Sequence, residues 1–424
     1  MKKLIFLTYI IVSTFIYTTE KNAYKYPYEN RYESTILGGS TLMLDYPLPK
    51  VKNKEYSIKI NPTESIPKNL WYQEGFKFSL AKQKNTAPLI FVIAGTGSSH
   101  DSLKMKYLER IFHNKGYHVI SISSPMYINF LLNAGTEKVP GLLMPDSQDI
   151  YKVMDLAYKK VKNKISVTDF YLTGYSLGAS QAAFVSYIDE KEKKFNFKRV
   201  FMINPTVDLY SSALIFDEML KESTNNDKKN IGVLIKEMLL QISKVTSDGD
   251  ISIDEEKIFS AFKEKKISYK KMKSLIALSF RMISIDLSYL SDLISHSGLY
   301  SKEFDNKKYP DMFSIYEKMN FPSFEEYFEN IAVPYYQKQG YSRSDILEKA
   351  KINTIEKYLK KSEKIMVVTN DDELILTSKE IKYLETIFKD RFKTYPLGGH
   401  CGNMFYTENV EIMLKFLQKG MKKE

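Results

Sequence analysis

The chain has 424 residues, long enough for a large core, and 62 basic against 51 acidic residues give it a formal net charge of +11. The lysines are spread along the whole chain and form no basic run interleaved with aromatic residues, so we expect no nucleic-acid partner. The only cysteine, Cys401, excludes an intramolecular disulfide and a cysteine-rich zinc site.

The N-terminus has the layout of an export signal. Lys2 and Lys3 precede an apolar run at residues 4–17, and polar residues follow. The run is shorter than the roughly 20 residues that a membrane-spanning helix needs. We therefore expect residues 1–23 to be the signal peptide of an exported protein, periplasmic or secreted. A segment that is not cleaved would anchor the chain to a membrane, and a buried N-terminal strand is a third interpretation.

Alternating strand and helix patterns predict an α/β fold. Residues 56–60 and 76–80 alternate in hydrophobicity, which predicts an antiparallel pair, whereas residues 89–94 form the continuous apolar run of a strand buried on both faces. Further strands are expected at 118–123, before Gly174, and at 199–203, 364–368 and 391–395. We expect a helix from Asp146 to about Lys160 and a last helix at 410–417. The sheet should be doubly wound and mostly parallel, with its site at the carboxyl ends of the strands.

Residues 206–351 interrupt this alternation. Their pattern is helical, with apolar residues on one face from Ile231 onward and a long apolar helix at 272–290. This predicts a large helical cap inserted between a first part of the core, residues 24–205, and a second part, residues 352–424. Residues 244–255 have a calcium-loop spacing, but Lys244 stands where a carboxylate is needed, so we expect a solvated turn and no metal.

The pentapeptide Gly174-Tyr175-Ser176-Leu177-Gly178 joins an apolar run to a helical pattern rich in small residues. Glycines two positions before and after a serine are typical of a nucleophile elbow, where the chain bends too sharply and packs too closely for β-carbons. The alternative is that Ser176 only caps a helix. We expect Ser176 to be a catalytic nucleophile.

The loop that begins Gly95-Thr96-Gly97 follows the buried strand at 89–94. It fails the dinucleotide fingerprint, because His100 occupies the sixth position, and it lacks the Gly-Lys-Ser/Thr of a P-loop, so we expect no cofactor. The loop suits an oxyanion hole built from the backbone amides of Thr96 and Leu177. A plain tight turn is the alternative.

An acid and a base follow Ser176 in the chain. Asp371 and Asp372 come after the strand at 364–368, and His400 lies in the glycine-rich loop after the strand at 391–395. Asp208 is a third candidate for the acid, although a helix cap is the favoured interpretation there.

Among the other histidines, only His100 is placed to contact a substrate. We expect His113 and His118 at the surface.

The order of Ser176, the aspartates and His400, with a cap before the acid, resembles the α/β-hydrolase superfamily from about residue 54 to the C-terminus, excluding the cap. The elbow and residues 204–209 are also similar to a group of exported bacterial hydrolases of unknown substrate. The resemblance implies that His400 is the base and that Asp372 is preferred as the acid, because Asp-Glu-Leu-Ile fits the family's usual Asp followed by a turn and aliphatic residues. The oxyanion loop departs from the family because it lacks the common His-Gly pair.

These features together predict a serine hydrolase that cleaves an ester, a thioester or an amide. An esterase or lipase is favoured, because the cap and the loop at residues 126–144 supply apolar surface for a small-molecule or lipid-like acyl substrate. The alternative is a non-catalytic binding protein on the same scaffold.

Overall fold

The computed structural model describes residues 24–40, 43–61, 66–245, 267–301 and 312–420. The predicted export segment, residues 1–23, lies outside these ranges, as does most of the stretch with calcium-like spacing.

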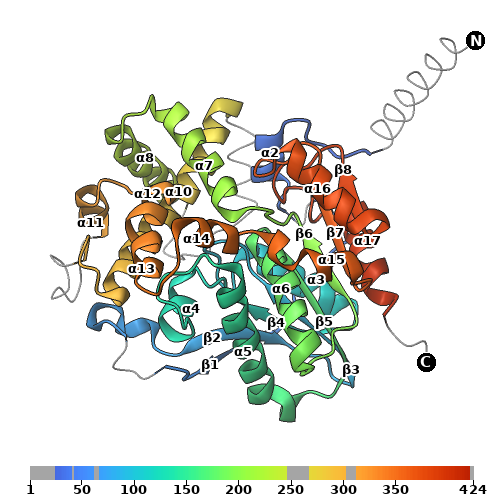
Figure 1. The fold of residues 1–424 in the computed structure, drawn as a ribbon. Coiled ribbons are helices and arrows are strands. Elements are labelled where there is room, and N and C mark those ends of the chain that lie inside the picture. The colour runs from blue at the N-terminus through green and yellow to red at the C-terminus, as the bar shows by residue number, and fades with distance from the viewer. Residues whose placement is uncertain (1–23, 41–42, 62–65, 246–266, 302–311, 421–424) are drawn as a thin grey trace, which may run out of the picture.

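One eight-stranded sheet forms the centre of the molecule, in the order β1-β2-β4-β3-β5-β6-β7-β8 (Figure 1). Strand β2 runs antiparallel to both β1 and β4, and every other neighbouring pair from β4 to β8 is parallel. The predicted antiparallel pair and the doubly wound, mostly parallel sheet are therefore confirmed. The strands are β1 (Asn53–Ile58), β2 (Phe76–Ala81), β3 (Ala87–Ile93), β4 (His118–Ile122), β5 (Val167–Tyr175), β6 (Val200–Ile203), β7 (Ile365–Asn370) and β8 (Phe392–Tyr395).

Helices cover both faces of this sheet. Alternate residues of β3 enter two separate cores: Leu89, Phe91 and Ile93 face one, and Ile90 and Val92 face the other. This alternation explains the continuous apolar run, because both faces of the strand are buried. The first core is completed by α5 (Leu143–Val161), α6 (Leu177–Glu192), α15 (Glu356–Lys361) and α16 (Ser378–Phe388), and the second by α3 (Leu103–Asn114) and α17 (Thr407–Gln418).

Helix α5 begins at Leu143, earlier than the sequence suggested. Asp146 therefore lies in the first turn of the helix and is not its N-cap, which is Leu142. The buried carboxylate of Asp146 instead accepts a hydrogen bond from the backbone N–H of Gly141 at 3.0 Å, which holds the preceding loop against the helix.

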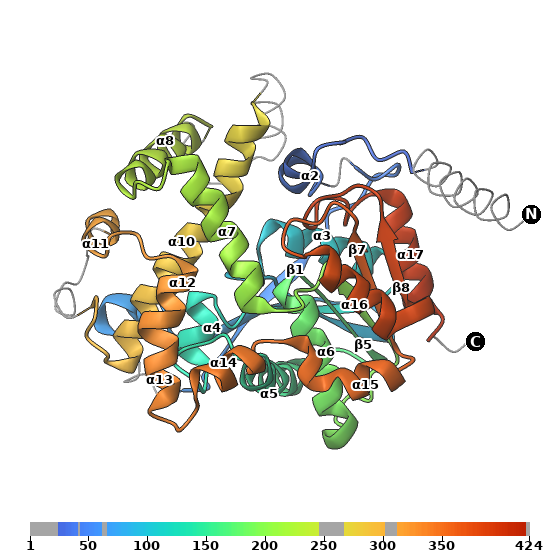
Figure 2. The ribbon, with the colours of Figure 1, turned by 45° about the horizontal axis from the view of Figure 1, so that its top comes forward.

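The insertion between β6 and β7 consists of helices joined by short loops in the residues that the structure describes, and it lies beside the carboxyl ends of the strands (Figure 2). Its two ends pair with each other through a bridge between Asp208 and Lys351. The cap comprises α7 (Leu209–Thr224), α8 (Lys229–Val245), α10 (Tyr269–Ser295), α11 (Met312–Lys318), α12 (Phe324–Tyr327), a π-helical turn (Phe328–Ala332), α13 (Val333–Gln337) and α14 (Arg343–Lys349).

Helix α10 is long and apolar enough to cross a membrane by composition alone, the one such helix in the described ranges. In its most apolar window, 61% is buried inside the molecule, and the helix packs against α7. We interpret α10 as the core helix of the cap.

The N-terminal residues 24–40, which we call the strap, pack against the opposite end of the chain. Both views show α2 (Arg31–Leu37), in blue, beside the red C-terminal elements (Figures 1 and 2). The ring of Tyr24 stacks on Tyr395 with 5.3 Å between centroids, and its hydroxyl donates to Asn409 at 3.1 Å. The sequence placed this segment within the first part of the core but predicted no helix or contact for it.

Candidate active site

Ser176 lies on a sharp turn between β5 and α6. Its backbone has φ 55° and ψ −130°, a conformation that non-glycine residues rarely adopt. A β-carbon on Gly174 would overlap the backbone of Gly178, and one on Gly178 would overlap the carbonyl oxygens of Ile93 and Ala94. The predicted elbow and the reason for its two glycines are confirmed.

His400 lies against this serine. Its Nε2 lies 2.9 Å from Ser176 Oγ and accepts a hydrogen bond from this hydroxyl when the ring is neutral with its proton on Nδ1. Both side chains are buried. The loop around the ring bends through positive φ angles at Gly398, Gly399 and Cys401. The structure therefore brings Ser176 and His400 together as the sequence predicted.

The carboxylate on the other side of the imidazole belongs to Glu373, and the choice of Asp372 is wrong in this respect. His400 Nδ1–H donates to Glu373 Oε1 at 2.8 Å. Asp372 instead accepts a hydrogen bond from the backbone N–H of Gly399, also at 2.8 Å. Asp372 thus supports the histidine loop without contacting the imidazole.

A turn at the end of β7 explains this difference. The backbone N–H of Glu373 donates to the carbonyl of Asn370 at 3.3 Å, so Asp371 and Asp372 are the central residues of a four-residue turn. Asp371 is exposed, whereas Glu373 follows the turn and is buried next to the imidazole. The sequence held a signal, since the carboxyl run extends to residue 373 and this type of acid is either Asp or Glu.

Both oxygens of the Glu373 carboxylate accept further hydrogen bonds. Its Oε1 also accepts from the backbone N–H groups of Leu374 at 2.7 Å and Ile375 at 3.3 Å. Its Oε2 accepts from the side-chain amide of Asn204 at 2.6 Å. These donors stabilise the charged carboxylate. Asn204, which directly follows β6, is thus part of the site.

Burial alone would lower the pKa of His400, because it disfavours the imidazolium. The neighbouring side chains of Cys401 and Glu373 favour the charged ring more strongly, so the pKa of His400 lies above its ordinary value. The Cys401 sulfur is 3.8 Å from Nε2.

The loop expected to supply an oxyanion hole lies next to Ser176. A β-carbon placed on Gly95 would come within 3.2 Å of the Ser176 β-carbon, so the backbone before Thr96 lies against the serine. Leu177 is the first residue of α6, where backbone N–H groups point out of the helix. The pairing of these two amides around an oxyanion stays a prediction.

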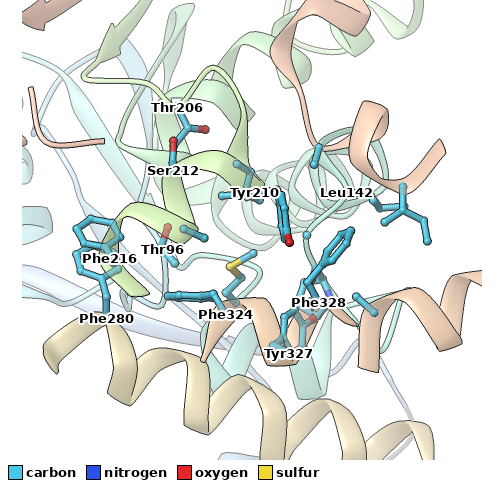
Figure 3. A pocket seen from close by; sticks show the side chains of 18 of the residues that line it. Thr96, Leu142, Thr206, Tyr210, Ser212, Phe216, Phe280, Phe324, Tyr327 and Phe328 are labelled. Carbon is cyan, nitrogen blue, oxygen red and sulfur yellow. Dashed lines mark hydrogen bonds between the residues drawn. The ribbon is translucent and has the colours of Figure 1, made fainter. Parts of the chain in front are cut away.

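Ser176 lines a pocket with about 720 Å³ of space free of protein atoms, the open solvent at its entrance included. Figure 3 shows Phe216 and Phe280 on one side of it and Tyr327 and Phe328 on the other. Among the described residues that line it, none is charged. The lining residues are Thr96, Met126, Pro140, Gly141, Leu142, Ser176, Thr206, Leu209, Tyr210, Ser212, Ala213, Phe216, Phe280, Phe324, Tyr327, Phe328, Ala332, Tyr336, Ile346, Ala350 and Ile375.

The cap is tied to the core along one wall of this pocket. The hydroxyls of Tyr327 and Tyr336 donate to the backbone carbonyls of Pro140 at 2.7 Å and Val139 at 2.5 Å. In addition, a β-carbon on Gly97 would come within 2.8 Å of Ile283 in α10, so the cap also packs directly on the loop that follows β3. The pocket is therefore built by core and cap together.

The remaining candidates lie elsewhere. Asp208 caps α7 by accepting from the N–H of Ser211 at 3.1 Å, as the favoured interpretation had it. His100 does not line the pocket, and its ring contacts Glu55 Oε2 at 3.2 Å and Ser123 Oγ at 3.3 Å. His118, expected at the surface, is fully buried. Its two ring nitrogens can be buried because they bond to the backbone N–H of Gln83 and the backbone carbonyl of Ser166.

His113 is near the surface, and His296 ends α10. Within the described ranges no group of three or more His, Cys, Asp or Glu side chains is arranged to hold a metal ion.

The sequence matches no protein-family model, and no curated protein resembles it significantly. Among solved structures, the chain is similar to the acylaminoacyl peptidase of Pyrococcus horikoshii, with a TM-score of 0.46 and 11% identity over 89% of this chain. The chain spans only 43% of that peptidase.

Two esterases are similar as well. Esterase B from Lactobacillus rhamnosis has a TM-score of 0.40, and the hyperthermophilic esterase from the archaeon Pyrobaculum calidifontis has one of 0.42. Each is 12% identical, and each match covers 92% of this chain and 90% of the esterase. Nothing about the activity of this chain follows from these similarities.

The carboxylate assignment can be tested by titrating His400. In an NMR titration of the imidazole we expect a pKa above the ordinary value of about 6.5. Glu373→Gln should lower this pKa, because the imidazolium loses the negative charge at Nδ1 while burial still disfavours it. Asp372→Asn is the matched control and should lower it less. Equal shifts, or a larger shift in Asp372→Asn, would contradict the assignment.

Proposed function

We propose that this chain is a serine hydrolase that transfers an uncharged acyl group from an ester or thioester to water through an acyl-enzyme on Ser176. The observation that carries the proposal is the continuous hydrogen-bond chain from Ser176 Oγ through His400 to Glu373, beside a pocket that Ser176 lines and whose described lining residues are all uncharged. A hydroxyl, an imidazole and a carboxylate in this order are the components of serine-type acyl transfer.

Each group would have one role. His400 Nε2 takes the Ser176 proton as Oγ forms a bond to the acyl carbonyl, and the amides of Thr96 and Leu177 stabilise the resulting oxyanion. The imidazolium then gives its proton to the departing oxygen or sulfur, and water cleaves the acyl-enzyme by the same steps. Glu373 holds the Nδ1–H tautomer and balances the charge of the imidazolium.

The pocket favours an apolar acyl group. A charged acyl chain would lose its hydration in this pocket without gaining an ion pair, whereas an alkyl chain or an aromatic ring would be transferred from water to an apolar lining. The pocket supports an esterase-like or lipase-like specificity over hydrolysis of a polar peptide. The pocket does not distinguish an ester substrate from a thioester substrate.

The activity test uses a fluorophosphonate probe and p-nitrophenyl butyrate. The wild type should be labelled at Ser176, and Ser176→Ala should be neither labelled nor active. Glu373→Gln should lower kcat about 10⁴-fold, because the imidazole loses its correct tautomer, while Asp372→Asn should lower it less than about tenfold.

A folded wild type that neither reacts with the probe nor cleaves such esters would contradict the proposal. It would instead favour a binding protein on this scaffold.

The substrate class is tested by filling the pocket. Ala213 lines the pocket from α7, and Ala213→Trp should reduce the ratio of kcat/KM for p-nitrophenyl decanoate over the acetate by at least about tenfold, because the long chain loses its space. Glu218→Trp, on an exposed position of the same helix, is the control and should leave the ratio unchanged. An unchanged ratio in Ala213→Trp would show that the acyl chain binds elsewhere.

A further inference from the structure

One face of α2 contacts both the loop of the histidine and the turn of the glutamate. The backbone N–H of His400 donates to the hydroxyl oxygen of Thr35 at 2.9 Å. The guanidinium of Arg31 donates to the backbone carbonyl of Glu373. Arg31 and Thr35 are four residues apart in a helix, so both side chains extend from the same face.

The Thr35 hydroxyl has a fixed orientation. It donates its own hydrogen to the carbonyl of Arg31 at 2.7 Å, within the helix, and so presents a lone pair to the His400 N–H. The backbone N–H of His400 therefore has an acceptor that the histidine loop itself does not supply. This is a specific contact between the strap and the residue that carries the imidazole.

The backbones of the strap and the histidine loop approach each other without side chains between them. A β-carbon on Gly399 would overlap the carbonyl oxygen of Arg31, and one on Gly402 would overlap that of Ser34. Because the contact is backbone on backbone, a displacement of α2 cannot be absorbed by a side-chain rotation and is passed to the loop.

The strap is also fixed at points away from this contact. The hydroxyl of Tyr24 accepts from the side-chain amide of Asn403 at 3.0 Å and donates to Asn409 at 3.1 Å. On the other side, α2 packs against α10 of the cap. The strap therefore links the histidine loop, the last helix and the cap.

We propose that the strap positions the active site, with Thr35 holding the backbone of His400 and Arg31 holding that of Glu373. This inference rests on the proposed function. Neither side chain touches the reacting atoms, so both are positioning residues that act through the main chain. Their loss would let the imidazole drift from Ser176, and a misplacement of about 1 Å costs on the order of 10²-fold in rate.

The kinetic test compares three variants. Thr35→Val keeps the shape of the side chain but removes the acceptor, and it should lower kcat by about 10- to 100-fold with little change in KM. Thr35→Ser restores a hydroxyl and should recover most of the loss. Thr386→Val is the matched control, because Thr386 makes the same bond within a helix, to Lys382 at 2.8 Å, on the exposed surface of α16, and it should leave kcat unchanged.

A proton NMR measurement tests this inference independently of the proposed function, because it does not require activity. The His400 Nδ1–H bonded to Glu373 should give a far-downfield proton resonance that is absent in His400→Ala. Thr35→Val should shift or broaden it, and Arg31→Met should do the same, which provides a second variant if the first folds poorly.

If the wild type proves inactive, the proposed function fails while the resonance still tests the strap. An unshifted resonance and an unchanged kcat in folded variants, or an equal loss in Thr386→Val, would overturn the inference.

Discussion

The strained backbone of Ser176, with its positive φ angle, is the constraint on which the site depends. A residue at φ 55° between a strand and a helix is stable only where its surroundings enforce it. Here the enforcement is steric and local: the backbone at Gly178 passes so close to the end of β3 that only a glycine fits. The same crossing places the serine hydroxyl next to the loop after β3 and at the N-terminus of α6.

The ends of three neighbouring strands complete the arrangement. Asn204 follows β6, Glu373 follows the turn after β7, and His400 follows β8. Because these strands are neighbours in the sheet, the three residues lie side by side and are joined by hydrogen bonds, although they are far apart in the sequence. The cap then closes the pocket over this edge, since tyrosine hydroxyls of the cap bind backbone carbonyls of the core. In the proposed function, the chemistry thus depends on residues of the core, and the acyl preference depends on core and cap together.

The sequence predicted the sheet, the cap, the elbow and His400, because glycine spacing and apolar runs report local backbone requirements. The carboxyl run includes Glu373, but the local pattern does not rank Glu373 above Asp372, since the direction of a side chain after a strand depends on the turn geometry at 370–373. The strap was also missed. Its contacts with the histidine loop join residues more than 360 positions apart in the sequence, and a local sequence pattern cannot predict such contacts.

The central claim is that Ser176 becomes acylated during turnover. The most direct measurement is mass spectrometry of the protein quenched while it hydrolyses p-nitrophenyl octanoate, followed by mapping of the modified peptide. The account predicts one octanoyl group on the peptide that contains Ser176, and none on Ser176→Ala under the same conditions. Steady hydrolysis without that adduct, together with an octanoyl group on Cys401 or with undiminished turnover by Ser176→Ala, would contradict it.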